Sequence, residues 1–309
     1  MIGLVTMSDT SVVTKSSYTC RWCKSDSDGA GRTCPSCGAP VNVKSVTTTS
    51  SGWEKQPPIP DMARIQFGQS RVQIEGDFVP TADFSLAEGD SVFFSHHAVL
   101  WTDPGIKLEA LPMAGALKRM RAGLPMVLAS AHGPGRIALS DDRAGEVIAV
   151  PIRAGTSVHV HEHHFLAATT GVDYQAEQTG IWFVTGSGDD RETHYPIGMY
   201  IDEFSSPGGH GLLLLHAGGN AFVRDLAPGQ SILIKPPSLL YKEPSVQMHL
   251  HIEHPTAQAA GWTSSSRANR YVWLRLIGPG RVCVQSQYEH FEDPGRSLTS
   301  VSSHTVQNW

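Results

Sequence analysis

Four cysteines near the N-terminus have the spacing of a metal site. They form two Cys-x-x-Cys pairs with ten residues between the pairs: Cys20, Cys23, Cys34 and Cys37. Each pair can form a tight turn, so that two thiolates approach one ion from each side in tetrahedral geometry. Gly38 follows the second pair and supplies the backbone freedom that such a turn uses. Because four thiolates leave no position for water, the pattern predicts one structural zinc ion per chain, in a zinc ribbon over residues 18–42.

Paired cysteines also have other uses. Two disulfides would need an oxidising compartment, and a redox-active pair would use one thiolate as a nucleophile. The first residues lack the basic and apolar regions of a secretory signal, so a cytoplasmic location is expected. Five cysteines, of which Cys283 stands alone, suit such a reducing compartment. Zinc binding is therefore the favoured interpretation.

Histidines are the second group that could carry chemistry. The chain has 15, and most of the clustered ones lie in two segments: His159, His161, His163 and His164, and then His249, His251 and His254. On strands, alternate histidines would share one face, and two such strands with Glu253 could surround a metal ion in a cupin-like metalloenzyme. A cupin motif places a longer spacer before its first histidine than the three residues that follow Gly155. The spacing therefore argues against that hypothesis.

The composition excludes some function classes. The chain is 40% hydrophobic and 17% charged with a net charge of −5, and no cluster of lysine and arginine is long enough to follow a phosphate backbone. Nucleic acid is therefore not expected as a partner. A nucleophile elbow, a phosphate-binding loop and a dinucleotide motif are not found. Lys118, Arg119 and Arg121 form a weak signal for peripheral membrane contact.

One nine-residue pattern occurs three times, and it predicts the elements that would position these groups. The copies begin at Leu86, Ile152 and Leu226, and each has a glycine three residues later, at Gly89, Gly155 and Gly229. Apolar residues then alternate at period two, which is typical of a strand with one buried face: Val92 and Phe94, Val158 and Val160, Ile232 and Ile234. A leucine follows each glycine by eleven residues, and we expect all three to be buried: Leu100, Leu166 and Leu240.

The repeat and the remaining segments predict a mainly β protein. Further strands are expected at residues 136–139, 211–215 and 272–277, and one helix at residues 113–122. Copies 66 and 74 residues apart are too long for a solenoid, so we predict three pseudo-equivalent β-sandwich lobes that share one core. In this repeat His159 aligns with Phe93 and Leu233. Such variability is typical of an outer or interface face, so we expect the clustered histidines to lie there.

The chain divides into five predicted segments. Residues 1–17 form a disordered tail, residues 18–42 the ribbon, and residues 43–60 a linker rich in proline, serine and threonine that leaves the ribbon free to move. Residues 61–290 form the repeated β domain, and residues 291–309 form a C-terminal tail.

Several segments resemble, in order, those of the altered inheritance of mitochondria protein 24 family, whose bacterial members were long described as a domain of unknown function. They are Gly135–Ser140, Gly145–Val150, Val158–Ala168 and Gly278–Gln285, within a resemblance that covers residues 63–287. The resemblance implies a fold like that of the tryptophan RNA-binding attenuation protein group, with pseudo-threefold repetition. It implies no catalytic residues, and an association with membrane organisation and assembly. The ribbon and the histidine-rich strand depart from the family pattern.

Three functions remain open at this point. The favoured one is a non-enzymatic scaffold or adaptor that forms homo-oligomers and binds protein partners, with the ribbon as a recognition module. The aliphatic inner faces of the repeats favour it, because they leave little room for catalytic groups. The others are a cupin-like metalloenzyme with a second metal ion at His159, His161, His249 and His251, and a peripheral membrane-organising protein.

Overall fold

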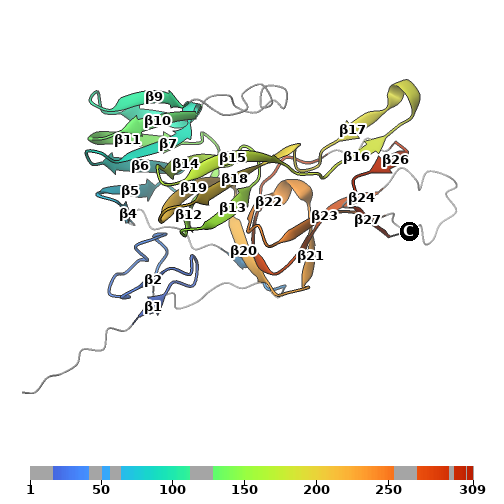
Figure 1. Cartoon of the computed structure of the whole chain (residues 1–309), viewed down its shortest axis with the longest axis horizontal. Helices are drawn as coiled ribbons and strands as arrows, with labels where there is room; N and C mark the ends of the chain where they lie inside the picture. The colour runs from blue at the N-terminus through green and yellow to red at the C-terminus, as the bar shows by residue number, and fades with distance from the viewer. Residues whose placement is uncertain are drawn as a thin grey trace, which may run out of the picture.

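The computed structural model is dominated by β-strands (Figure 1). It describes residues 17–41, 51–55, 64–111, 128–253, 270–291, 296–303 and 305–308. Within these ranges there are strands and short 3-10 helices but no α-helix, and no helix that is long and apolar enough to cross a membrane. The prediction of a mainly β fold is confirmed. The predicted helix at 113–122, the basic trio Lys118, Arg119 and Arg121, and all but the last residue of the predicted tail at 1–17 lie outside the described residues.

Three segments of the chain have strands in the same order, and we call them units A, B and C. Unit A contains β6 (Thr81–Leu86), β7 (Ser91–Ser95), β8 (Val99–Thr102), β9 (Lys107–Leu111), β10 (Leu128–His132) and β11 (Gly135–Ser140). Unit B contains β12 (Gly145–Ile152), β13 (Thr156–Val160), β14 (Phe165–Thr169), β15 (Asp173–Gln178), β18 (Tyr200–Ser206) and β19 (Gly211–Gly218). Unit C contains β20 (Ala221–Leu226), β21 (Ser231–Ile234), β22 (Leu239–Lys242), β23 (Gln247–Glu253), β24 (Tyr271–Ile277) and β25 (Gly280–Gln285).

The strands of each unit pair in the same antiparallel pattern. In unit A, β6 and β8 pair with β11, while β7 and β9 pair with β10. The corresponding strands make the same pairs in unit B and in unit C. One further strand pair joins each unit to the next, and we call such a pair a joint. β7 pairs with β14 between units A and B, and β13 pairs with β22 between units B and C. The sequence repeat therefore corresponds to a repeated strand pairing, whereas a pseudo-threefold arrangement of the units in space stays a prediction.

These joints combine the units into large sheets. One has the order β12-β19-β14-β7-β10-β9, and another the order β15-β18-β13-β22-β25-β20-β3, in which β3 is Glu54–Lys55. A third has the order β4-β5-β6-β11-β8, with β4 at Arg64–Phe67 and β5 at Ser70–Glu75. A fourth has the order β21-β24-β23-β27, with β27 at Thr305–Asn308. A smaller sheet contains β16 (Phe183–Thr185), β17 (Glu192–His194) and β26 (Leu298–Val301). The predicted linker and the predicted C-terminal tail thus contribute strands to the sheets.

The hydrophobic core differs from the single shared core that we predicted. In the described part of the β units it consists of three clusters of buried residues: one around Phe84 and Phe94, one around Phe204 and Leu240, and one around Leu250 and Leu274. Most residues of each cluster come from two of the large sheets, so each cluster fills the space between a pair of sheets. The third cluster also includes Phe183 of the smaller sheet. Because the strands that join the units form continuous sheets, these sheets separate the apolar interior into layers.

The repeated turns are as the sequence predicts. Gly89, Gly155 and Gly229 have φ angles of 84°, 74° and 75°, a region that residues with a side chain rarely adopt. After each turn, the alternating residues of the second strand face the core: Val92, Phe94, Val158, Val160 and Ile234 are buried, and Ile232 is partly buried.

The three equivalent leucines all occupy β-bulges. In β8, β14 and β22 the register against the partner strand shifts by one residue, and the residue left without an opposite partner is the leucine: Leu100, Leu166 and Leu240, respectively. Leu166 and Leu240 are buried, but Leu100 is 60% exposed, so the prediction of three buried leucines is wrong for Leu100. The reason is its position: β14 and β22 lie between two strands, whereas β8 is the outer strand of its sheet among the described residues.

Candidate metal centre and the adjoining pocket

The first Cys-x-x-Cys pair lies in the turn of a short hairpin. β1 (Tyr18–Thr19) and β2 (Asp26–Ser27) pair on either side of it. The main-chain N–H of Cys20 donates to the carbonyl of Ser25, and the N–H of Lys24 donates to the carbonyl of Cys20, both at 2.8 Å. Lys24 has a φ of 58°, in the left-handed region. The residue type does not predict this conformation, because lysine is not typical of the left-handed region.

The second pair repeats this geometry. The N–H of Cys34 donates to the carbonyl of Ala39 at 2.7 Å, and the N–H of Gly38 donates to the carbonyl of Cys34 at 2.8 Å. Gly38 has a φ of 73°, which confirms that its backbone freedom is used here. The two turns therefore present their cysteines in the same way, as two halves of one site.

The four sulfur atoms lie at distances that suit one tetrahedral ion. The Sγ atoms of Cys20 and Cys37 are 3.8 Å apart, those of Cys23 and Cys34 are 3.6 Å apart, and all four lie within 4.8 Å of one another. A metal–sulfur bond of about 2.3 Å in a regular tetrahedron requires sulfur atoms about 3.8 Å apart. All four cysteines are free, and the separations far exceed the roughly 2 Å of a disulfide.

The crowded thiols also favour a cation. A side-chain hydrogen bond with Cys23 lowers the pKa of Cys20, whereas a hydrogen bond with Cys20 raises the pKa of Cys37. In the absence of a cation, neighbouring thiols therefore share protons instead of all ionising. A divalent ion would remove this conflict, because it binds every sulfur as a thiolate. The site can therefore hold a metal ion with four thiolates and no open position.

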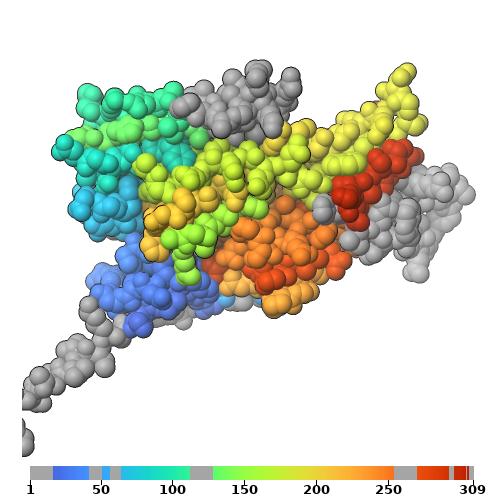
Figure 2. All heavy atoms as spheres, viewed as in Figure 1, coloured from blue at the N-terminus to red at the C-terminus, as the bar shows by residue number. Residues whose placement is uncertain are grey.

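The ribbon is docked against the β units, contrary to the expectation that it is free to move (Figure 2). Arg281 of β25 forms an ion pair with Asp225 of β20 at 2.8 Å and donates a further hydrogen bond to the main-chain carbonyl of Trp22 in the ribbon. Arg153 donates to the carbonyl of Lys24, whose ammonium lies 3.5 Å from Asp225. Burial lowers the pKa of Arg281, but the hydrogen bond with Asp225 raises it by more. The net pKa is therefore raised, and this guanidinium stays charged.

Glu54 extends the contact from a different element. It lies on β3, which pairs with β20, and it forms an ion pair with Arg21 of the ribbon. Ala149 of β12 packs against the small apolar cluster around the cysteines. The contacts come from both units B and C, so the docking position was not visible in any single segment of the sequence.

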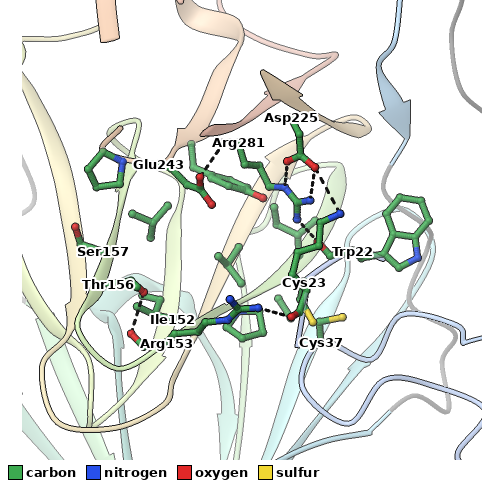
Figure 3. Close-up of a pocket in the computed structure, with 18 of the residues that line it drawn as sticks. Trp22, Cys23, Cys37, Ile152, Arg153, Thr156, Ser157, Asp225, Glu243 and Arg281 are labelled. Carbon is green, nitrogen blue, oxygen red and sulfur yellow. Dashed lines mark hydrogen bonds and ion pairs between the residues drawn. The ribbon is translucent and has the colours of Figure 1, made fainter. Parts of the chain in front are cut away.

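A pocket of about 630 Å³ lies where the ribbon meets the β units (Figure 3). The ribbon contributes one wall with Trp22, Cys23 and Cys37, and β12 contributes an apolar wall that includes Ile148 and Ile152. Charged side chains lie around it: Lys24, Arg153, Asp225, Glu243 and Arg281. Burial raises the pKa of Tyr241, which also lines the pocket, so its hydroxyl stays neutral. The pocket combines an apolar surface with fixed charges of both signs.

The family model described as Mitochondrial biogenesis AIM24 matches residues 72–287 of this chain. The chain belongs to the AIM24 family. The match covers units A to C, and the ribbon precedes it. A crystal structure of a Streptococcus pyogenes protein is similar to this chain, with 19% sequence identity and a TM-score of 0.52 over 71% of this chain and 94% of that chain. This likeness shows the β fold alone. No curated protein matches the chain.

The structure places the two histidine segments of the AIM24 region in different sheets. His159 lies on β13 and His251 lies on β23, and these strands are separated by the cluster of core residues between their sheets. Among the described residues, no group of potential metal ligands combines histidines from both segments. The cupin-like arrangement of His159, His161, His249 and His251 is therefore not formed.

His159 instead approaches two carboxylates. Its ring and the carboxylates of Glu177 and Glu203 offer ligand atoms within 4.8 Å of one another, which is close enough for a metal ion. Burial lowers the pKa of the neighbouring Lys242 to about 8, against the opposing effect of Glu177 and Glu203. We interpret these four residues as an ion network, because the ammonium of Lys242 supplies positive charge beside both carboxylates. Glu203 lies on β18, which pairs with β13, and Glu177 lies on β15, which pairs with β18. The histidine spacing does not indicate which strands become neighbours.

Several clustered histidines are buried, which corrects the expectation of an outer face. His164 and His251 are buried, and the ring of His164 contacts the carbonyl of His216 at 2.9 Å and the side-chain amide of Gln285 at 3.0 Å. Burial lowers the pKa of His159 and His161 to about 4 and that of His164 to about 3. These three rings are therefore neutral near pH 6.

Proposed function

We propose that this AIM24-family chain is a non-enzymatic scaffold that associates with copies of itself and binds protein partners. The observation that carries the proposal is the pair of outer strands β8 and β21. Each is the outer strand of its sheet among the described residues, and each exposes large apolar side chains: Leu100 and Trp101 on β8 are 60% and 40% exposed, and Leu233 on β21 is 41% exposed. An outer strand with apolar side chains favours pairing with another chain.

We further infer that the ion of the ribbon is zinc, held by Cys20, Cys23, Cys34 and Cys37. Four thiolates in tetrahedral geometry suit zinc, and such closed sites are structural. A ribbon of this size has a very small apolar core, so the metal would supply most of its folding free energy. All five cysteines are free, which supports a reducing, cytoplasmic location.

The ribbon would serve as the recognition module through the pocket beside it. A volume of about 630 Å³ lies within the range of binding pockets. Its apolar wall and its charges of both signs suit a short segment of a partner protein, with one apolar anchor and flanking polar groups. Because the ribbon forms one wall, zinc would be required to complete this surface.

Sedimentation velocity of the zinc-loaded chain at increasing concentration tests the proposed self-association. We expect the mean sedimentation coefficient to rise with concentration. The matched control is Phe78→Ser, which removes a side chain that is 82% exposed in the turn between β5 and β6, and it should leave the association unchanged. A chain that remains monomeric at every concentration would contradict the proposal.

A further inference from the structure

The joints between neighbouring units follow one rule. The second strand of each unit pairs with the third strand of the next unit, as β7 does with β14 and β13 with β22. The registers are equivalent as well. Phe94 lies opposite Ala167 in the first joint, and Val160 lies opposite Tyr241 in the second. In the sequence repeat, Phe94 corresponds to Val160, and Ala167 corresponds to Tyr241.

This rule leaves two complementary strands at the ends of the array. The third strand of unit A is β8. Among the described residues, no unit precedes unit A, so β8 has no partner in a joint. Unit C has a second strand, β21, that is likewise the outer strand of its sheet in the described part of the chain. The two ends are therefore the two halves of one more joint of the same kind.

The exposure of the side chains agrees with an incomplete joint. At the position of Leu100, the equivalent residues of the two formed joints are Leu166 and Leu240, and both are buried. At the position of Trp101, the equivalent residues are Ala167 and Tyr241, which are buried too. Leu233 corresponds to Phe93, which is buried in the first joint. The exposed residues of the two ends thus occupy positions that a joint covers elsewhere in the same chain.

The amino-acid types of the end strands also distinguish them from two other outer strands, β9 and β15. Residues 99–102 and 231–234 contain no charged side chain. By contrast, β9 and β15, each of which is one of the two outer strands of a sheet that contains a joint, carry charges such as Lys107, Glu109 and Glu177. Charged residues on an outer strand oppose pairing with another chain. That protection is absent from β8 and β21.

We propose that β21 of one copy pairs antiparallel with β8 of a second copy, in the register that the internal joints use. Ile234 then lies opposite Trp101, and Leu233 lies opposite Thr102. This proposal rests on the self-association proposed above, and it specifies which two strands form the contact and in which register. It would join the sheet that runs from β4 to β8 with the sheet that runs from β21 to β27 into one continuous sheet. Because the two surfaces differ, the contact is head-to-tail and produces a ring or an open chain of copies.

Two aspartate variants test the proposal, because each blocks one end only. Leu100→Asp places a charge in the bulge of β8, and Leu233→Asp places the same charge on β21. Both side chains are exposed in the single chain, so folding should be retained, and circular dichroism would verify it. Each variant alone should lose the association of the wild type. An equimolar mixture should form a one-to-one dimer, because Leu233→Asp retains an intact β8 and Leu100→Asp retains an intact β21.

Leu108→Asp is the matched control, since Leu108 is 46% exposed on the charged outer strand β9. Its association should equal that of the wild type. The proposal is overturned if the mixture remains monomeric while the wild type associates, or if Leu108→Asp abolishes association and the other two variants do not. In either case the scaffold function would stand with a different surface. A wild type that never associates would instead contradict both proposals.

Discussion

Replacing the three bulge leucines with alanine should give three unequal losses of stability. Leu166 and Leu240 are buried in different core clusters, so their truncation removes buried methyl groups and leaves a cavity. Such changes cost about 2–5 kcal/mol of unfolding free energy. Leu100 is 60% exposed. Burying a whole leucine contributes about 1.5–3 kcal/mol, so the covered two-fifths of Leu100 contributes about 1 kcal/mol or less, without a cavity.

Urea unfolding, followed by circular dichroism at a protein concentration below that of self-association, measures these differences. Zinc should be present throughout, so that the ribbon remains folded. The three substitutions are chemically identical and occupy equivalent bulges, so each serves as a control for the others. A loss for Leu100→Ala as large as that for Leu166→Ala would refute the conclusion that β8 is an open end.

Two further predictions concern the metal centre and the buried histidines. Cys23→Ser should reduce the zinc content, measured by elemental analysis, from one ion per chain to a small fraction. It should also make the ribbon sensitive to protease, while the unfolding transition of the β units remains. The control is Cys283→Ala, which changes a buried cysteine outside the ribbon and should retain the zinc. The pKa of His164 is lowered from 6.5 to about 3 by burial, so its contribution to stability is present above pH 6.5 and is lost as pH falls towards 3. Between pH 7.5 and pH 5 the wild type should lose about 2 kcal/mol more unfolding free energy than His164→Asn, and equal losses would contradict the assignment.

The features that the sequence predicted correctly are local in the chain. The spacing of Cys20, Cys23, Cys34 and Cys37 identified the cluster, because two short turns bring each pair together without help from distant residues. The positions of Gly89, Gly155 and Gly229 identified the repeated turns, because a positive φ restricts the choice of residue. Family membership followed from short segments within units A to C, each of which is continuous in the sequence.

The features that the sequence did not predict depend on which strands become neighbours. Leu100 has the same local pattern as Leu166, and only the place of β8 at the edge of its sheet exposes it. Glu203 approaches His159 because β18 pairs with β13. Arg281 docks the ribbon although it is more than two hundred residues away in the chain. Strand order of this kind is a property of the whole fold, which the spacing of residues in one segment does not specify.

Cross-linking at the predicted register tests the head-to-tail account most directly. Thr102→Cys and Leu233→Cys place thiols on directly opposed residues of the two copies, and the native cysteines lie in the metal cluster or, as Cys283, in the core. After zinc loading and mild treatment with oxidised glutathione, a mixture of the two variants should form a disulfide-linked heterodimer, and neither variant alone should form a linked homodimer. Homodimers of Thr102→Cys alone would contradict the account. So would a Leu233→Cys variant that links to Thr102→Cys no better than it links to Leu108→Cys.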